Sequence, residues 1–380
     1  MSATSGRLEI DRWTRYWIKR LAEAAGGGQL RWEQLCRQPI AQPPLHHLVE
    51  RIEVPLAGQQ RTVRLVRKEL KLSDWASSLL QETILREAKW YAADLSALLP
   101  VSLELPALEV VWQEEHHAIV LLRDVREDLE RWQKARERGM DRAIETLARL
   151  HSALSGEDVR ARLRWLPRYE RFFVTAFAQH LAASTGELAA VAGGEELLKG
   201  APDFEAGIEI WLGCLPPRIR TLVTGLWRDP SPILERLRSL PHSVIHGDPG
   251  PQHFGLSTCG EEERIVLIDW EFVAWGPPII DLVHLVLFRQ FDRVPSRGYC
   301  HSACERYFDS VPDGTWQLPR GESRRMAWEL ATALWVLAYG QRHGQALCQV
   351  PVGQRPQHPS WVALQQEATL LEEACGQWLR

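Results

Sequence analysis

The sequence predicts an α+β protein with two lobes: a small β-rich lobe with one main helix, then a large, mostly helical lobe. Three observations lead to this fold class. Strand-like hydrophobic patterns and one helical pattern occupy residues 1–124. Helical periodicity then dominates residues 125–380, and only a short strand-rich stretch at 243–269 interrupts it. A chain of 380 residues is also long enough to bury two hydrophobic cores.

The first lobe is expected to begin with a helix and a hairpin. Residues 8–24 predict an amphipathic helix with tryptophans on one side, and three glycines at 26–28 end it. We expect the tryptophan side to pack on the same chain, with a docked partner as the alternative. Strands are predicted at 49–56 and 61–70, and the short glycine-containing turn between them is typical of an antiparallel hairpin.

The remaining elements of the first lobe follow in order. Residues 75–99 predict its main helix, which Pro100 ends. A second strand pair is predicted at 108–113 and 117–122. Beyond it, the pattern over 139–154 predicts the first of many helices in the second lobe.

Composition excludes several classes of protein. The formal net charge of −4 is not that of a dedicated nucleic-acid binder, which would carry a basic surface. No run approaches the roughly 18 apolar residues that a membrane helix needs. Asp11 and Arg12 lie where a signal peptide would have its apolar segment, so we expect a cytoplasmic protein that binds neither nucleic acid nor membrane. The sequence does not predict an oligomeric state.

The seven cysteines are scattered along the chain and do not predict a disulfide framework. Cys300, His301 and Cys304 are close enough in sequence to raise the question of a metal site. However, no second pair of ligands follows at a usual spacing, so we interpret them as neighbours on a helix in a reducing compartment.

The candidate chemistry lies in residues 243–285. A short apolar strand leads into His246, Gly247 and Asp248, and a second apolar run ends at Asp269. We expect these two strands to form a hairpin that presents both carboxylates at one edge. Two clustered carboxylates suit a divalent cation together with a general base, because Mg²⁺ prefers oxygen ligands.

These motifs resemble those of the aminoglycoside phosphotransferase and choline kinase-like family, which is related to the protein kinases. The resemblance rests on H-G-D at 246–248 and on I-D-W-E-x-x-x-x-G-P-x-x-x-D at 268–281. It implies a protein kinase-like fold and an ATP-dependent transfer of a phosphoryl group to a hydroxyl. The acceptor would be a small molecule (an antibiotic, an amino alcohol or a sugar) or a Ser/Thr of a peptide. Three further segments are similar to family elements: VRLVRKEL (63–70), REAKWYAADL (86–95) and LARLHSAL (147–154).

The resemblance assigns roles to individual residues. Asp248, in the catalytic motif with His246, would accept or orient the acceptor hydroxyl. Asp269 would bind the Mg²⁺ that bridges the phosphates. Lys68 would hold the α- and β-phosphates of ATP and pair with Glu87, with Lys71 and Glu82 as the alternatives. Two further assignments concern the adenine and the catalytic loop: the backbone of Leu121, Leu122, Arg123 and Asp124 would bind adenine, and Asp281 would brace the loop.

The chain departs from the family pattern in two places. His253 stands where the family has an asparagine metal ligand, and Gln252 precedes it, so either would replace that ligand and Mn²⁺ becomes a candidate beside Mg²⁺. No glycine occurs over residues 29–57, although the family has a glycine-rich phosphate loop. The alternative function is therefore a degenerate kinase-fold protein that binds a nucleotide or a partner without catalysis.

The acceptor site is expected among helices between 155 and 240 and after 285. The acidic segment 186–210 within this region has two interpretations. It is a solvated loop, or it forms a wall that attracts a cationic acceptor.

Overall fold

The computed structural model divides the chain into two compact units. The first unit takes its residues from Met1–Ser73, Thr83–Asp94 and Leu105–Glu127, and the second from Leu95–Glu104 and Asp128–Arg380. No helix in the part of the chain that the structure describes is long and apolar enough to cross a membrane. The structure describes residues 11–24, 26–40, 48–58, 60–72, 85–191, 194–195, 197, 201–259, 262–288, 295–313, 315–316 and 318–378.

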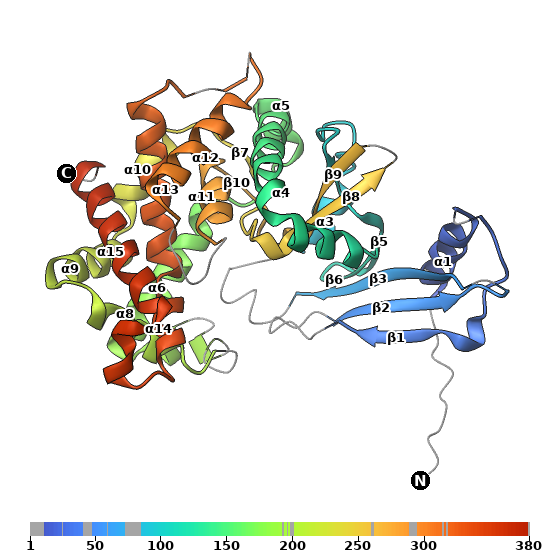
Figure 1. Ribbon diagram of the computed structural model, residues 1–380, viewed down its shortest axis with the longest axis horizontal. Helices are drawn as coiled ribbons and strands as arrows, with labels where there is room; N and C mark the ends of the chain where they lie inside the picture. The colour runs from blue at the N-terminus through green and yellow to red at the C-terminus, as the bar shows by residue number, and fades with distance from the viewer. Residues whose placement is uncertain are drawn as a thin grey trace, which may run out of the picture. The chain divides into compact units, whose positions relative to one another are not determined.

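The first unit is built on an antiparallel sheet with the strand order β1-β2-β3-β6-β5. Lys68 on β3 lies opposite Val49 of β2 and Val120 of β6, so it occupies the centre of the sheet. Figure 1 shows β1, β2 and β3 side by side. The strands are β1 (Cys36–Pro39), β2 (Leu48–Pro55), β3 (Thr62–Lys71), β5 (Ala107–Glu114) and β6 (His117–Arg123).

One helix covers each face of this sheet. Helix α1 (Arg12–Ala24) packs through Ile18 against the face that carries Leu65, and the tryptophan side of the helix joins this core. Helix α3 (Arg86–Ala92) packs through Ala88 against the face that carries Val66. The two faces follow from the period of two along β3, which sends successive side chains to opposite sides. The expectation that α1 packs on its own chain is confirmed.

Two predictions for the first unit need correction. The helix predicted over 75–99 ends at Ala92, because Asp94 takes a positive φ of 46° and the chain then turns. Residues 75–84 of that prediction, including the alternative Glu82, lie outside the described residues. The short edge strand β1 was not predicted, because its four residues show no clear alternation.

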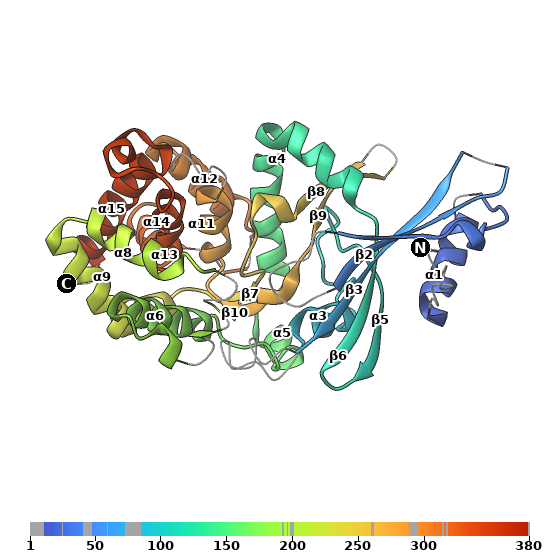
Figure 2. The ribbon, with the colours of Figure 1, turned by 90° about the horizontal axis from the view of Figure 1, so that it is seen from below.

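The second unit is mostly helical (Figures 1 and 2). Helix α4 begins in the last residues of the first unit and is much longer than the predicted 139–154. The helices are α4 (Arg126–Ala153), α5 (Glu157–Arg162), α6 (Glu170–Thr185), α8 (Phe204–Cys214), α9 (Pro217–Arg228), α10 (Ser231–Arg238), α11 (Ile279–Leu287), α12 (Arg297–Asp309), α13 (Glu322–Tyr339), α14 (Gln341–Leu347) and α15 (Pro359–Trp378), with 3₁₀ turns η2 (Leu188–Ala190), η3 (Pro251–His253), η4 (Trp270–Phe272) and η5 (Val352–Gln357). A further 3₁₀ turn, η1 (Trp32–Gln34), belongs to the first unit.

Two small sheets in the second unit carry the candidate loops. Strand β9 (Glu262–Leu267) pairs with β8 (Phe254–Cys259) and with β4 (Leu103–Glu104). Strand β7 (Ser243–Ile245) pairs instead with β10 (Ala274–Gly276). The predicted hairpin between the strands before Asp248 and Asp269 is therefore wrong, because β8 lies between them in sequence and is the hairpin partner of β9.

The pairing of β4 with β9 explains how the chain is divided between the two units. We expected one lobe over 1–124, whereas Leu95–Glu104 belongs to the second unit. Strand β4 in this segment runs parallel to β9, with Leu103 opposite Ile265, and the backbone N–H of Ile265 donates to Ser102. These contacts attach a segment from early in the sequence to the second unit.

Candidate active site

The first unit brings together the predicted lysine and glutamate. Lys68 Nζ lies 2.5 Å from Glu87 Oε2, and both side chains are buried. The lysine comes from the centre of β3 and the glutamate from the first turn of α3, on the face of the sheet that α3 covers. The predicted pairing is confirmed. Lys71, the alternative, is more than half exposed at the end of β3 and pairs with Glu69.

Residues 122–124 end β6 and begin the connection to α4. The backbone N–H of Arg123 donates to the carbonyl of Pro106 at 2.9 Å. The Asp124 carboxylate accepts from Arg51 Nε at 2.9 Å and from the backbone N–H of Arg126 at 3.0 Å. Asp124 therefore holds the start of α4 to β2, and the Arg123 amide is already occupied within the sheet.

In the second unit, β7 leads directly into the tight turn of His246, Gly247 and Asp248. Gly247 has a φ of 87°, and a Cβ there would lie 2.4 Å from the carbonyl oxygen of Phe272. Only glycine meets both constraints, because other residues rarely adopt this conformation and none lacks a Cβ. The glycine thus lets the loop approach the segment that follows Asp269.

His246 links this loop to the strand that precedes Asp269. Its ring is fully buried, Nδ1 accepts from the backbone N–H of Asp248 at 3.2 Å, and Nε2 lies 2.9 Å from the carbonyl of Ile268. These partners place the ring proton on Nε2. Burial lowers the pKa of His246 to about 4, although the Asp281 carboxylate opposes the shift, so the ring is neutral at physiological pH.

Asp281 holds the backbone of the same turn. Its carboxylate accepts from the N–H of His246 at 2.6 Å and from the N–H of Gly247 at 2.9 Å. His151 Nε2 lies 3.1 Å from the same carboxylate, and Tyr307 Oη lies 2.7 Å from His151 Nδ1. Burial alone would raise the pKa of Asp281, but the interactions with His151 and with the loop hold it below its usual value. The expected bracing role of Asp281 is confirmed by these contacts.

Asp248 has a partner that the sequence did not reveal. His284 Nε2 lies 2.8 Å from Asp248 Oδ1, and the His284 side chain is buried while about a quarter of the Asp248 side chain is exposed. Burial would raise the pKa of Asp248, but the hydrogen bond with His284 lowers it well below its usual value. The carboxylate is therefore ionised. One signal was available: His284 follows Asp281 by one helical turn, so both reach the same loop.

Asp269 has an unusual backbone conformation. Its φ and ψ are 68° and 61°, in the left-handed region that non-glycine residues rarely occupy. About a third of its side chain is exposed, and its Oδ2 lies 3.4 Å from His253 Nε2. His253 Nδ1 lies 2.7 Å from the carbonyl oxygen of Asp248 and 3.8 Å from Asp248 Oδ2. His253 therefore stands between the two predicted carboxylates.

The donor set around His253 fits a divalent cation. Because Nδ1 faces a carbonyl oxygen, it carries the ring proton, and the Nε2 of a neutral ring then turns its lone pair toward the Asp269 carboxylate. Two electron-pair donors facing each other in this way favour a cation between them. The exposed Gln252 places its amide against Gly250.

Among the described residues, no group of three or more His, Cys, Asp or Glu side chains is arranged to hold a metal ion. Cys300 and Cys304 are buried neighbours on α12, as expected from their spacing. A cation at Asp269 would thus take most of its ligands from phosphates and water, as Mg²⁺ does in many nucleotide sites.

Aromatic side chains surround His284. Its ring stacks on Phe288 with centroids 5.1 Å apart and meets the edges of Tyr339 and Trp335 at 5.3 and 6.3 Å. Tyr339 in turn stacks on Phe172 of α6 at 6.4 Å. The wall near Asp248 is therefore built from α6, α11 and α13, of which α6 and α13 lie in the two regions where the acceptor site was expected.

The fold and site together define a class of protein. The antiparallel sheet with its paired lysine and glutamate, followed by a mostly helical unit with the H-G-D and I-D-W-E loops, is a protein kinase-like fold. The model of the phosphotransferase enzyme family matches residues 52–313. The chain therefore belongs to this family of kinase-type phosphotransferases.

Several solved structures are similar to the chain at low sequence identity. The GDP complex of an aminoglycoside 2'-phosphotransferase-IIIa is 12% identical, with 96% of this chain and 99% of that chain covered and a TM-score of 0.49. An ethanolamine kinase of Plasmodium vivax is 13% identical, with 97% and 89% covered and a TM-score of 0.49. A choline/ethanolamine kinase family protein of Mesorhizobium loti is 16% identical, with 95% and 94% covered and a TM-score of 0.42. No curated protein matches the chain.

Proposed function

We propose that this protein is an ATP-dependent phosphotransferase that moves the γ-phosphoryl group to a hydroxyl. The acceptor is a small molecule, such as an antibiotic, an amino alcohol or a sugar, or a Ser/Thr of a peptide. The observation that carries the proposal is the arrangement around His253, which places the partly exposed Asp248 and Asp269 on two loops linked through His246. Family membership supports the same reaction class.

Asp248 orients the acceptor and takes its proton. Oδ1 faces His284, so the other oxygen, Oδ2, is the atom that accepts the hydrogen bond of the acceptor hydroxyl. The hydroxyl oxygen then bonds to the γ-phosphorus, the bond to the bridging oxygen breaks, ADP leaves with that electron pair, and the proton passes to Asp248. The low pKa of Asp248 suits orientation more than early proton abstraction.

We assign His246 a different part from the catalytic role expected from its motif. Its ring is fully buried and both nitrogens have partners within the protein, so it has no atom with which to contact a substrate. His246 instead fixes the position of Asp248 relative to the strand that carries Asp269. It is a positioning residue.

The remaining roles concern the metal and the nucleotide. Asp269 and His253 hold a divalent cation, which when bound neutralises phosphate charge; Gln252 reaches it only if its amide leaves Gly250. Lys68, fixed by Glu87, holds the α- and β-phosphates. The Arg123 amide is engaged by Pro106, so adenine would use the other backbone groups of 122–124.

The test is a panel of variants assayed for turnover of ATP and GTP with hydroxylated antibiotics, amino alcohols, sugars and peptides. Asp248→Ala should abolish transfer, a loss of at least about 10³-fold, while nucleotide affinity stays unchanged. Asp269→Ala should abolish both turnover and the electron paramagnetic resonance signal of nucleotide-bound Mn²⁺. Glu235→Ala, an exposed carboxylate on α10, is the matched control and should behave as wild type.

Wild-type protein that binds Mg²⁺-nucleotide but turns over no acceptor would favour the second candidate, a degenerate kinase-fold protein. The absence of glycine over residues 29–57, where a phosphate-binding loop would be expected, supports that candidate. Failure of Mg²⁺-nucleotide to bind at all would contradict both.

A further inference from the structure

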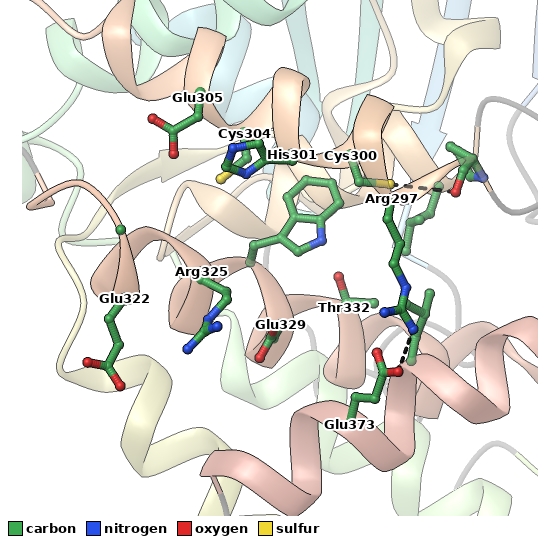
Figure 3. Close-up of a pocket in the computed structure, with 15 residues that line it drawn as sticks. Arg297, Cys300, His301, Cys304, Glu305, Glu322, Arg325, Glu329, Thr332 and Glu373 are labelled. Atoms are coloured by element: carbon green, nitrogen blue, oxygen red, sulfur yellow. Dashed lines mark hydrogen bonds and ion pairs between the residues drawn. The ribbon is translucent and has the colours of Figure 1, made fainter.

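A cavity lies in the helical unit, among α12, α13, α15 and the end of α11. Its volume is about 560 Å³, within the range of small-molecule sites. Figure 3 shows Cys300, His301 and Cys304 on one side facing Arg325 and Glu329 of α13 on the other. None of its lining residues has been assigned to the catalytic loops, the metal or the nucleotide.

The walls of this cavity are largely apolar. Leu287, Trp328 and Leu370 contribute hydrocarbon and aromatic surface. Burial raises the pKa of the Cys300 thiol to about 11 and that of Cys304 to about 12, so both stay neutral and behave as small apolar groups. The half-buried Trp328 also lines the cavity, and an indole is a side chain on which a flat ligand can stack.

One polar group inside the cavity has no partner. Thr332 is only 2% exposed and lines the cavity, yet its hydroxyl makes no hydrogen bond to any part of the chain that the structure describes. An unsatisfied buried hydroxyl costs on the order of 1–3 kcal/mol, so such groups usually have a function or a bound partner. Thr332 therefore supplies a hydroxyl with no partner among the described residues at the wall of this largely apolar cavity.

The lining of the cavity carries an excess of negative charge. Four carboxylates line it against two guanidinium groups, and Arg324 from outside the lining pairs with one of the four, Glu305: the lining groups are Glu305, Glu322, Glu329 and Glu373 against Arg297 and Arg325. The guanidinium of Arg297 is paired with Glu373 across α12 and α15 (Figure 3). Arg297 is 72% exposed and Glu373 46%, so this ion pair contributes little to stability.

We propose that this cavity binds a small amine with an aromatic body. The ring stacks on Trp328 and packs against Leu370, a polar atom of the ligand bonds to the Thr332 hydroxyl, and the ammonium group lies near Glu329. A protonated amine also gains from the face of an indole ring. The site is independent of the phosphoryl-transfer proposal, because no catalytic residue lines it.

Three matched probes test the chemistry on the full chain by isothermal titration calorimetry and ligand-observed NMR. Phenethylamine should bind, 2-phenylethanol should bind about fivefold more weakly, and phenylacetate should not bind. Wild-type protein that is folded by circular dichroism but binds phenethylamine no better than phenylacetate would overturn the proposal.

Variants locate the binding. Leu370→Trp fills the cavity and should abolish phenethylamine binding. Should that variant fail to fold, Glu329→Gln provides the second test, since glutamine keeps the shape and still accepts the hydrogen bond from Trp378. It should weaken phenethylamine about fivefold and leave 2-phenylethanol unchanged. Asp248→Ala should bind as wild type. Binding that survives both cavity variants, or that Asp248→Ala abolishes, would overturn the assignment.

Discussion

Asp269 combines a strained backbone conformation with a proposed role in metal binding. Its left-handed backbone conformation costs a residue with a Cβ about 1–2 kcal/mol relative to glycine. Such strain persists where the surrounding structure imposes it, and it is concentrated at functional sites. Here the strained conformation, which follows the end of β9, directs the Asp269 carboxylate toward His253.

We predict that Asp269→Gly unfolds with a free energy about 1–2 kcal/mol higher than Asp269→Ala, because both variants lose the same carboxylate and only alanine retains the strain. Both should be inactive. Urea denaturation of the two variants measures the difference. Equal stabilities would mean that the backbone relaxes in Asp269→Ala and that no strain is stored there.

His284 allows a second test at the residue scale. Replacing it by leucine leaves Asp248 Oδ1 without its partner, so the carboxylate loses its fixed orientation. We expect His284→Leu to lower kcat by about 10–100-fold with little change in the KM for ATP. His284→Gln, which retains a donor, should recover part of the rate.

The comparison of these two variants separates positioning from folding. If His284 only fills space within its aromatic surroundings, glutamine should be as harmful as leucine, and thermal unfolding temperatures should fall in parallel with activity. A rate in His284→Gln no higher than in His284→Leu would therefore count against the assignment.

At the scale of elements, β3 serves two purposes through its two faces. Lys68 points toward α3, whereas its neighbours Arg67 and Glu69 lie on the opposite face. There Glu69 accepts from Arg67 and Lys71 at 2.9 Å and lies 3.0 Å from His117. Burial would raise the pKa of Glu69, but Lys71 and Arg67 lower it from 4.5 to about 2.

This shift predicts a pH dependence of stability. The pKa is lower in the folded state, so ionised Glu69 stabilises the fold above pH about 4.5, and the effect declines as the pH falls toward 2. Glu69→Gln should lower the free energy of unfolding by about 1–3 kcal/mol at pH 7 and by only about a quarter of that near pH 2.5. Urea denaturation at pH 2.5–7 tests this, with the exposed Glu33→Gln as control. A pH-independent difference would contradict the ionic origin.

The elements that the sequence predicted are those with local signals. Alternating residues predicted β2, β3, β5 and β6 within one or two residues at each end. The strand β4 and the pairing of β7 with β10 have no such signal, because two- and three-residue strands are defined by a distant partner. The resemblance to the family selected Asp248, Asp269, Lys68 and Glu87 as candidate site residues. The proximity of His253 to both aspartates could not be predicted, because it depends on how two loops meet.

At the scale of the whole molecule, the turn that carries Asp248 is held by residues that are far apart in sequence. Tyr307 of α12, His151 of α4 and Asp281 of α11 form a buried chain of hydrogen bonds that ends on the amides of His246 and Gly247. No local pattern predicts such a chain. It joins three helices to one loop, so the position of Asp248 depends on the packing of much of the second unit.

Tyr307→Phe tests this dependence with the smallest possible change. The variant removes one hydroxyl and leaves His151 Nδ1 buried without its donor, which should lower the free energy of unfolding by about 1–3 kcal/mol. Because this series of hydrogen bonds ends on the backbone of the turn that carries Asp248, kcat should fall several-fold while the KM for ATP stays near the wild-type value. Chemical denaturation and steady-state kinetics measure the two effects, and Tyr16→Phe, at a half-exposed position on α1, is the control. Loss of stability with an unchanged kcat would show that the chain stabilises the helices without positioning Asp248.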